Sequence, residues 1–171
     1  MAGFQSKTFT KHDSYMTPPC AWDNIKHLIP NDKIIWESAY GDGESGEYLK
    51  SLGFQIFHKN IDYFKNEPAD WDIQITNPPF SKKKEWFNRA KELNKPFIIL
   101  APASMICTQY IRKLFSEDKL QIIIPRKRIH FIKLINGVKP EGWKNQCNFD
   151  CFYYCWKMNL EKDIIWLQNT K

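Results

Sequence analysis

The sequence has no long hydrophobic run. Its longest apolar stretches, such as residues 97–101, are far too short to cross a bilayer. Residues 1–11 also lack the apolar core that a secretory signal peptide requires. These two absences argue against a membrane protein and against a secreted one, so we expect an intracellular, cytoplasmic chain.

Paired cysteines are absent as well. The five cysteines stand at positions 20, 107, 147, 151 and 155, and no two of them form a Cys-x-x-Cys pair. An odd number of cysteines without a signal peptide indicates free thiols in a reducing compartment. Cys147, Cys151 and Cys155 are spaced by four residues, but their segment is aromatic and strand-like, which favours core thiols over an iron–sulfur site. We therefore predict no metal.

The chain contains no internal repeat, no low-complexity stretch and no glycine–serine linker. Its 171 residues suffice for one domain with a real core but are few for two. A hydrophobic content of 43% and an aromatic content of 15% favour a folded globule over a disordered chain. We predict one domain over residues 1–171, with residues 1–14 loosely held.

Positive charge is in excess and is clustered. The net charge is +6, and the excess gathers at residues 82–84 and 126–128. Such clusters suit a polyanion, although surface lysines often serve only to solvate a face. The candidate nucleic-acid-binding residues are Lys82, Lys83, Arg126, Lys127 and Arg128.

Strand-like and helix-like segments alternate over the first two-thirds of the chain. The expected strands are residues 33–39, 54–58, 71–76, 96–101, 120–124, 148–158 and 164–167. The expected helices are residues 21–28, a segment that ends near residue 52, residues 82–93 and residues 108–115. This alternation predicts a mainly parallel α/β sheet with helices on both faces. The consecutive strands near the end predict an antiparallel C-terminal edge.

A glycine-rich turn, residues 40–46, follows the first expected strand. Glycines let a backbone turn sharply and approach a ligand, and ligands of open α/β sheets bind beyond the carboxyl ends of the strands. The turn is neither a full dinucleotide pattern nor a Gly-Lys-Ser/Thr phosphate loop. Glu37 and Asp42 suit a cationic ligand better than a phosphate. A purely structural turn is the alternative.

The tetrad Asn77-Pro78-Pro79-Phe80 is the most informative motif. Two consecutive prolines cannot continue a sheet ladder, and they fix a rigid, extended backbone. Such a backbone can hold the Asn77 amide oxygen and the Pro78 carbonyl as acceptors for the two N–H groups of an exocyclic amine. Phe80 offers a face on which a planar ring can stack. The alternative, that the prolines merely end a strand, is less favoured with the glycine turn upstream.

These motifs together resemble the class I S-adenosylmethionine-dependent methyltransferases, specifically those that methylate adenine N6. Residues 37–43 are similar to their cofactor-binding motif, and the tetrad matches their catalytic tetrad at all four positions. Asp13, Tyr15, Thr17 and Pro18 resemble the amino-terminal motif that closes over the methionine moiety of the cofactor. The resemblance implies a Rossmann-like fold, S-adenosyl-L-methionine as the cofactor, and DNA methylation, with RNA as the alternative substrate.

Nearly the whole chain also resembles small adenine-specific methyltransferase-like proteins that phages and viruses often encode. The segments that carry this resemblance are residues 61–64, 71–73, 77–83, 94–97 and 126–131. It implies a viral or phage origin. The resemblance to the methyltransferases implies these site residues: catalytic Asn77, Pro78, Pro79 and Phe80, and cofactor-binding Tyr15, Thr17, Glu37, Ser38, Ala39, Gly41, Gly43 and Asp62.

The sequence departs from the family pattern in two places. Where the second strand usually ends in an acid that holds the cofactor ribose, this chain has Phe57-His58-Lys59-Asn60. Asn60 or Asp62 therefore takes that role, or the chain binds the cofactor weakly. Asp62 alternatively contacts the adenine ring of the cofactor. The chain also has no room for a separate target-recognition domain. Recognition then comes from loops such as residues 126–144, from a homodimer or recognition subunit, or from a very short target.

The tetrad by itself does not identify the substrate. The leading prediction is methyl transfer to the exocyclic N6 amine of adenine in DNA. Similar tetrads occur in enzymes that methylate adenine or guanine in RNA and in enzymes that methylate a glutamine amide in release factors. A further alternative is a catalytically inactive methyltransferase-fold subunit that binds nucleic acid or a partner. Trp143, in a loop rich in glycine and lysine, either stacks on a base or packs in the core.

Overall fold

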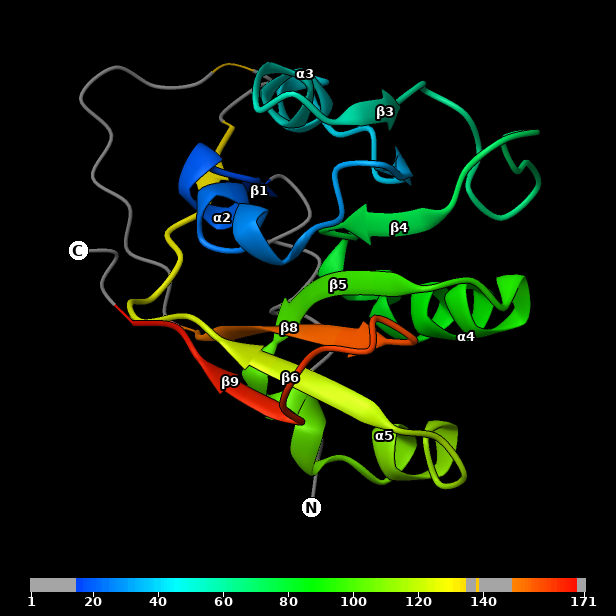
Figure 1. Ribbon diagram of the computed structural model, residues 1–171, viewed down its shortest axis with the longest axis vertical. Coiled ribbons are helices and arrows are strands. Elements are labelled where there is room, and N and C mark those ends of the chain that lie inside the picture. Colours follow the sequence, from blue (N-terminus) through cyan, green and yellow to red (C-terminus); the bar gives the residue numbers. More distant parts are fainter. Residues whose placement is uncertain (1–14, 135–137, 139–148, 169–171) are drawn as a thin grey trace.

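The computed structural model describes residues 15–134, 138 and 149–168 (Figure 1). Asp13, Trp143 and the segment 1–14 that was expected to be loosely held lie outside these residues. The strands are β1 (Tyr15–Met16), β2 (Ile34–Trp36), β3 (Gln55–Phe57), β4 (Ile73–Thr76), β5 (Phe97–Pro102), β6 (Leu120–Ile124), β7 (Ile132–Lys133), β8 (Cys151–Trp156) and β9 (Ile164–Trp166).

Four α-helices and three short 3₁₀ segments accompany these strands within the described ranges. The helices are α2 (Pro19–Asp23), α3 (Glu44–Ser51), α4 (Lys83–Leu93) and α5 (Gln109–Leu114), and the 3₁₀ segments are η1 (Lys26–Leu28), η2 (Phe80–Lys82) and η3 (Ala103–Cys107). The helix expected over residues 21–28 is therefore split, because α2 begins at Pro19 and ends at Asp23 before η1. No helix in this part of the chain is long and apolar enough to span a membrane.

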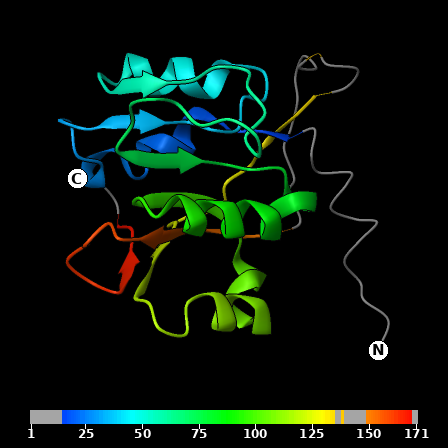
Figure 2. The same cartoon turned by 90° about the vertical axis from the view of Figure 1, so that its right-hand side faces the viewer.

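Seven strands form one sheet in the order β3-β2-β4-β5-β8-β6-β9. β2, β3, β4 and β5 pair in parallel, and Figure 2 shows β2, β3 and β4 running side by side in one direction. β8 is antiparallel to both β5 and β6, so β6 runs in the same direction as β5, and β9 is parallel to β6. The carboxyl ends of six strands therefore lie at one edge of the sheet.

The predicted α/β, Rossmann-like sheet is confirmed, but its predicted antiparallel C-terminal edge is wrong. The antiparallel strand β8 lies inside the sheet, and the edge strand β9 pairs in parallel. Five of the six residues of β8 are buried, and an apolar strand of this kind needs neighbours on both sides and both faces. Ile164 and Trp166 of β9 are exposed, as an edge strand permits.

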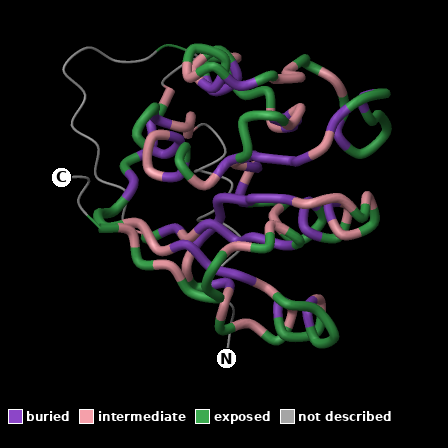
Figure 3. Tube along the Cα trace, viewed as in Figure 1, coloured by how far each residue is buried: buried purple, intermediate pink, exposed green. Residues whose placement is uncertain are grey.

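Helices cover both faces of the sheet, as the alternating pattern predicted, and each face has its own core. Successive residues of β5 point to opposite faces, because side chains alternate along a strand. Ile98 packs in the core under α2 and α3, while Phe97 and Ile99 pack in the core under α4 and α5. Figure 3 shows the buried residues concentrated along the central strands.

A two-stranded sheet was not predicted from the sequence. β1 pairs antiparallel with β7, with Tyr15 opposite Lys133 and Met16 opposite Ile132. Strands of two residues leave no periodic pattern to detect. The pairing fastens the segment before α2 to the segment that follows β6, and both of these segments reach the candidate site.

Gly46, in the first turn of α3, allows the helix to lie directly on His58. A Cβ at position 46 would stand 2.7 Å from the His58 Cβ and 2.2 Å from its Cδ2. The His58 Cβ is fixed by its backbone, so rotation of the ring relieves only part of such a clash. α3 and the segment after β3 are therefore packed at a distance that only glycine allows.

We expect Gly46→Ala to lower the free energy of unfolding by about 1–3 kcal/mol, as overpacking does. Alanine is otherwise the better helix former, so a net loss of stability reports the contact with His58. Urea unfolding followed by circular dichroism measures the effect. Glu47→Ala, at the exposed neighbouring position, is the matched control; it removes only an exposed ion pair with Lys50 and should change stability far less. A Gly46→Ala protein as stable as wild type would contradict the packing.

Candidate functional site

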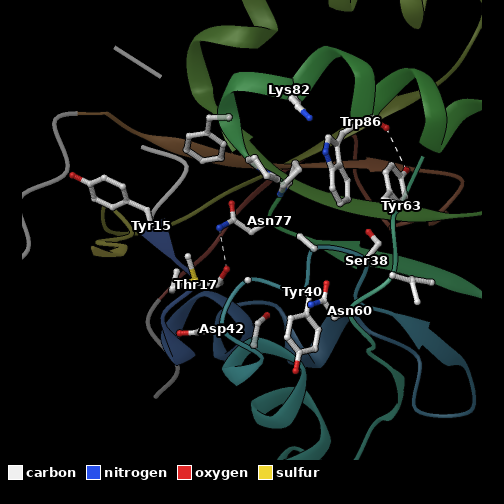
Figure 4. A pocket seen from close by; sticks show the side chains of 18 of the residues that line it. Tyr15, Thr17, Ser38, Tyr40, Asp42, Asn60, Tyr63, Asn77, Lys82 and Trp86 are labelled. Atoms are coloured by element: carbon white, nitrogen blue, oxygen red, sulfur yellow. Dashed lines mark hydrogen bonds between the residues drawn. The ribbon is translucent and has the colours of Figure 1, made fainter. Parts of the chain in front are cut away.

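A cavity of about 450 Å³ lies at the carboxyl edge of the sheet. Its walls come from the segment around β1, the turn after β2, the loop after β3 and the segment that joins β4 to α4 (Figure 4). The volume lies within the range of small-molecule sites, and the carboxyl edge is where open α/β sheets bind ligands. Its position brings the glycine-rich turn and the Asn-Pro-Pro-Phe tetrad to opposite sides of one space.

The turn after β2 needs glycine at two positions. Gly41 (φ 58°) and Gly43 (φ 88°) both have left-handed backbones, which glycine adopts without strain. A Cβ on Gly41 would lie 3.1 Å from the sulfur of Met16, so the absent side chain also lets β1 approach the turn. The Gly43 N–H donates to the Tyr40 carbonyl (2.9 Å), and the Tyr40 ring stacks on His58 with centroids 4.9 Å apart.

Glu37 lies beneath this turn and does not line the cavity. Its side chain is buried, and Oε1 accepts hydrogen bonds from the Ala39 N–H (3.0 Å) and the Thr76 hydroxyl (2.8 Å). Burial, which penalises the charged form, raises the pKa of the Glu37 carboxyl, and the nearby His58 opposes part of that rise. Glu37 therefore ties the end of β2 to the end of β4.

An aromatic pair forms another wall of the cavity. The ring of Tyr63 stacks on that of Trp86, with centroids 3.8 Å and planes 6° apart. Tyr63 Oη donates to Gln74 Oε1 (3.3 Å), and Gln74 Nε2 donates to Ser38 Oγ (2.7 Å). Burial raises the pKa of Tyr63, so its hydroxyl stays protonated and keeps donating. Hydrogen bonds through Gln74 thus connect the stack to Ser38, which also lines the cavity.

Asn77 stands at the centre of the cavity wall, and its side chain is held at one end only. Nδ2 donates to the hydroxyl of Thr17 (2.9 Å), a contact drawn in Figure 4. Oδ1 is buried and has no hydrogen-bond partner among the described residues. A buried carbonyl oxygen without a partner is costly and uncommon, so a donor supplied by a ligand is the natural complement.

The rest of the tetrad is packed tightly. Phe80 is 4% exposed, and its ring makes edge-to-face contacts with Phe131 (centroids 5.7 Å apart) and Phe149 (5.5 Å). Lys83 Nζ donates to the Phe80 carbonyl oxygen (3.0 Å). Pro79 has an extended backbone (φ −53°, ψ 125°), as the double proline predicted. Phe80 therefore lines the cavity as part of a fixed aromatic cluster.

The chain is similar to a known methyltransferase. It is 26% identical over 143 residues to the type II methyltransferase M.EcoRI of Escherichia coli. The matched region covers 83% of this chain and 37% of that relative, so the chain spans little more than a third of the relative's length. No family model matches. The similarity confirms the predicted resemblance to the class I methyltransferases, while the phage or viral type stays a prediction.

Two solved structures resemble the fold. A dimethyladenosine transferase from Plasmodium falciparum has a TM-score of 0.48 at 10% identity, over 82% of this chain and 62% of that protein. A predicted O-methyltransferase from Agrobacterium tumefaciens has a TM-score of 0.37 at 11% identity, over 78% of this chain and 76% of that protein. The strand order and register given above define the fold.

The structure brings most of the predicted site residues together. Those that line the cavity are Tyr15, Thr17, Ser38, Ala39, Gly41, Asp62, Asn77, Pro78, Pro79, Phe80 and Lys82. Glu37 and Gly43 shape the turn without lining it. Among the described residues, no group of three or more His, Cys, Asp and Glu side chains is arranged to hold a metal ion. The assignment of binding and catalytic roles to these residues remains a prediction.

Four of the five predicted nucleic-acid-binding residues lie in two places, and Lys83 lines neither of them. Lys82 stands at the cavity mouth, and Figure 4 shows its amine directed toward the cavity. Arg126, Lys127 and Arg128 line a separate groove. Arg128 is paired with Asp150, through Nε to Oδ1 (2.8 Å) and Nη2 to Oδ2 (3.1 Å), and this pairing lowers the pKa of Asp150.

Sequence reasoning missed the aromatic walls. Trp86 falls in the apolar stripe of α4 and so matches an ordinary core position, and Phe131 was noted only as the last residue of the family-like segment 126–131. Tyr63 was noted only within the family-like segment 61–64. One signal in the sequence pointed to this side of the cavity, namely that the acid which usually holds the cofactor ribose is missing after β3. That departure made Asn60 a candidate, and Asn60 lines the cavity.

Glu37→Gln should change how stability depends on pH. Because the pKa of Glu37 is raised on folding, the folded protein binds its proton more tightly than the unfolded chain does. The free energy of unfolding should then fall as the pH rises above about 4.5, by up to about 1.4 kcal/mol per pH unit. Glutamine keeps an oxygen acceptor but does not titrate, so that fall should be absent.

Urea unfolding of both proteins from about pH 4.5 to neutrality measures this difference, since other groups contribute equally to both. Glu47→Gln is the control. In the wild type, the hydrogen bond to Lys50 lowers the pKa of the Glu47 carboxyl. The contribution of Glu47 to the pH dependence of stability therefore lies below that pH window. Parallel stability profiles for wild type and Glu37→Gln would show that Glu37 does not titrate abnormally.

Proposed function

We propose that this chain transfers a methyl group from S-adenosyl-L-methionine to the exocyclic N6 amine of adenine in DNA. The observation that carries the proposal concerns Asn77. Its amide nitrogen donates to Thr17, and its buried oxygen has no hydrogen-bond partner in the part of the chain that the structure describes. An exocyclic amine has N–H donors for such an oxygen. The sequence resemblance supplies the reaction class, and the clustered positive charge supports a nucleic-acid substrate.

The cavity suits the proposed cofactor. Its polar lining includes the carboxylates of Asp42 and Asp62, which favour a cationic ligand, and the bare backbone of Gly41 permits close approach. Asp62 Oδ1 already accepts the Phe64 N–H (3.0 Å), whereas the Asn60 amide has no hydrogen bond to another described residue. We therefore assign Asn60 as the residue that binds the ribose hydroxyls of the cofactor, while Asp62 stabilises its own loop through the bond to Phe64.

The bound cofactor supplies an electrophilic methyl group on a sulfonium. In the proposed reaction Asn77 Oδ1 and the Pro78 carbonyl accept the N–H groups of the amine, which orients the nitrogen lone pair. The new N–C bond forms as the S–C bond breaks, and the nitrogen then releases a proton. Phe80 contacts the flipped base. Positioning and electrostatics supply the catalysis, so this chain needs no covalent nucleophile.

The test is transfer of labelled methyl to single-stranded DNA, duplex DNA and RNA in parallel, followed by nucleoside analysis. We expect N6-methyldeoxyadenosine. Asn77→Ala should abolish transfer while cofactor affinity, measured by calorimetry, stays nearly intact, because the amide acts on the amine. Asn88→Ala, on the exposed face of α4, is the control and should transfer normally.

Each other outcome has a definite meaning. N6-methyladenosine in RNA alone would assign the RNA alternative. Absence of both product and cofactor binding would assign a non-catalytic methyltransferase-fold subunit. Full activity in Asn77→Ala would remove Asn77 from the mechanism.

Thr17→Val should separate the positioning of Asn77 from its chemistry. Valine has nearly the shape of threonine but no oxygen, so the Asn77 amide loses its hydrogen bond to Thr17 and the orientation that this bond fixes. We expect single-turnover transfer to fall about ten- to a hundredfold. Thr17→Ser retains the hydroxyl and should restore most of the rate. Equal rates in the valine variant and wild type would show that Thr17 does not orient the amide.

A further inference from the structure

A second groove of about 940 Å³ lies outside the candidate active site. Its lining comes from α2 and η1, from residues 126–129 after β6, and from β9 with the residues that follow. Ile129 is buried, and Ile165 and Leu167 pack partly against the core, so the groove has an apolar floor. Basic side chains border this floor.

The groove and the cavity belong to the same edge of the sheet. β6 and β9 run in the same direction as β2 and β4, so the carboxyl ends of all four strands lie on that edge. Two segments also connect the two spaces directly. Thr17 lines the cavity and Cys20 the groove, while Ile129 lines the groove and Phe131 the cavity. A chain-like ligand in the groove is thus within a few residues of the cavity.

Positive charge in the groove is only partly neutralised. Lys26 pairs with Asp23 (3.1 Å), and Arg128 pairs with Asp150. Arg126 and Lys127 are exposed, and neither forms an ion pair with another described residue. Two adjacent uncompensated cations at the border of an apolar floor fit a ligand that carries both phosphates and planar apolar rings.

Trp166 completes the chemistry of the groove. It is 65% exposed, which makes it the most exposed of the large aromatic side chains in the described part of the chain. The register of β6 and β9 places Trp166 beside Ile124, two residues before Arg126. An exposed indole beside phosphate-binding cations is the arrangement by which proteins hold unpaired nucleotides, since a base stacks on the ring while the backbone meets the charges.

We propose that this groove binds the unpaired nucleic-acid strand that flanks the target base, with a base stacked on Trp166 and phosphates on Arg126 and Lys127. The proposal rests on the proposed function for the identity of the target. It explains how a chain of this size holds its substrate, because the groove leads to the cavity along both connecting segments. A stacked base must be unpaired, so single strands bind more tightly than duplexes.

The experiment is fluorescence anisotropy with a labelled oligodeoxythymidine of about twelve nucleotides, titrated at several salt concentrations. This probe contains no adenine, so it measures binding without methyl transfer. Trp166→Ala should weaken binding about tenfold with little change in salt dependence. The double variant Arg126→Ala/Lys127→Ala should weaken binding and also reduce the slope of log K against log salt by about 1.4, or about 0.7 for each phosphate that is no longer neutralised.

The matched control is Arg112→Ala/Lys113→Ala, which removes two exposed adjacent cations from α5 on the opposite face. It should bind like wild type. Circular dichroism melting confirms that each variant is folded, and if Trp166→Ala fails to fold, the two charge variants still decide. A duplex of equal length should bind more weakly than the single strand.

The proposal is overturned by equal losses in the two charge variants, by unchanged binding in Trp166→Ala, or by a wild-type protein that does not bind the oligonucleotide. Methyl transfer is scored separately. If binding behaves as expected but no nucleic acid is methylated, the groove is a strand-binding site and the proposed enzymatic function is wrong. If transfer occurs and both groove variants keep the wild-type KM for a long single strand, the groove fails and the proposed function stands.

Discussion

The Glu37 carboxylate is buried where two neighbouring parallel strands end, and the geometry of the candidate site depends on it. A buried carboxylate is tolerated only when hydrogen bonds replace its water. Here the donors are the Ala39 N–H, in the turn after β2, and the Thr76 hydroxyl, in the last residue of β4. The backbone carbonyl oxygen of Glu37 is hydrogen-bonded to Nδ1 of His58 (2.9 Å). Glu37 thus joins three parts of the site. These are the start of the glycine turn at Ala39, the residue before the tetrad at Thr76, and His58, on which α3 packs.

A second constraint acts from the other side of the cavity. The hydrogen bond from Asn77 to Thr17 joins residues 60 positions apart, and the pairing of β1 with β7 joins the same early segment to residues near 132. The wall of the cavity is therefore assembled from three distant parts of the chain. This arrangement holds the Asn77 amide while leaving its oxygen free for a ligand.

The sequence predicted those parts of the site that follow from local rules. Residues 37–43 and the tetrad each follow an apolar run, and parallel neighbours end at the same edge, so their meeting was foreseeable. The role of Glu37 was not foreseeable, because an acidic residue at the end of a strand can face a ligand or turn inward. Here the hydroxyl of Thr76 binds the carboxylate and holds it inward. The stacking of Tyr63 on Trp86 was also out of reach, since it joins a loop to a helix with no shared pattern. The place of β8 in the sheet depends on partners that its own residues do not specify.

The position of β8 has a consequence for the order in which the fold is completed. Among the described strands, β8 alone links β5 to β6, so the two portions of the sheet, β3-β2-β4-β5 on one side and β6-β9 on the other, share no ladder until residues 151–156 are in place. A ribosome delivers these residues after both of their partner strands, β5 and β6. Until then the inner edges of β5 and β6 expose unpaired backbone groups, which are prone to wrong pairing. Closure of the sheet is thus a late, long-range step in the life of the nascent chain.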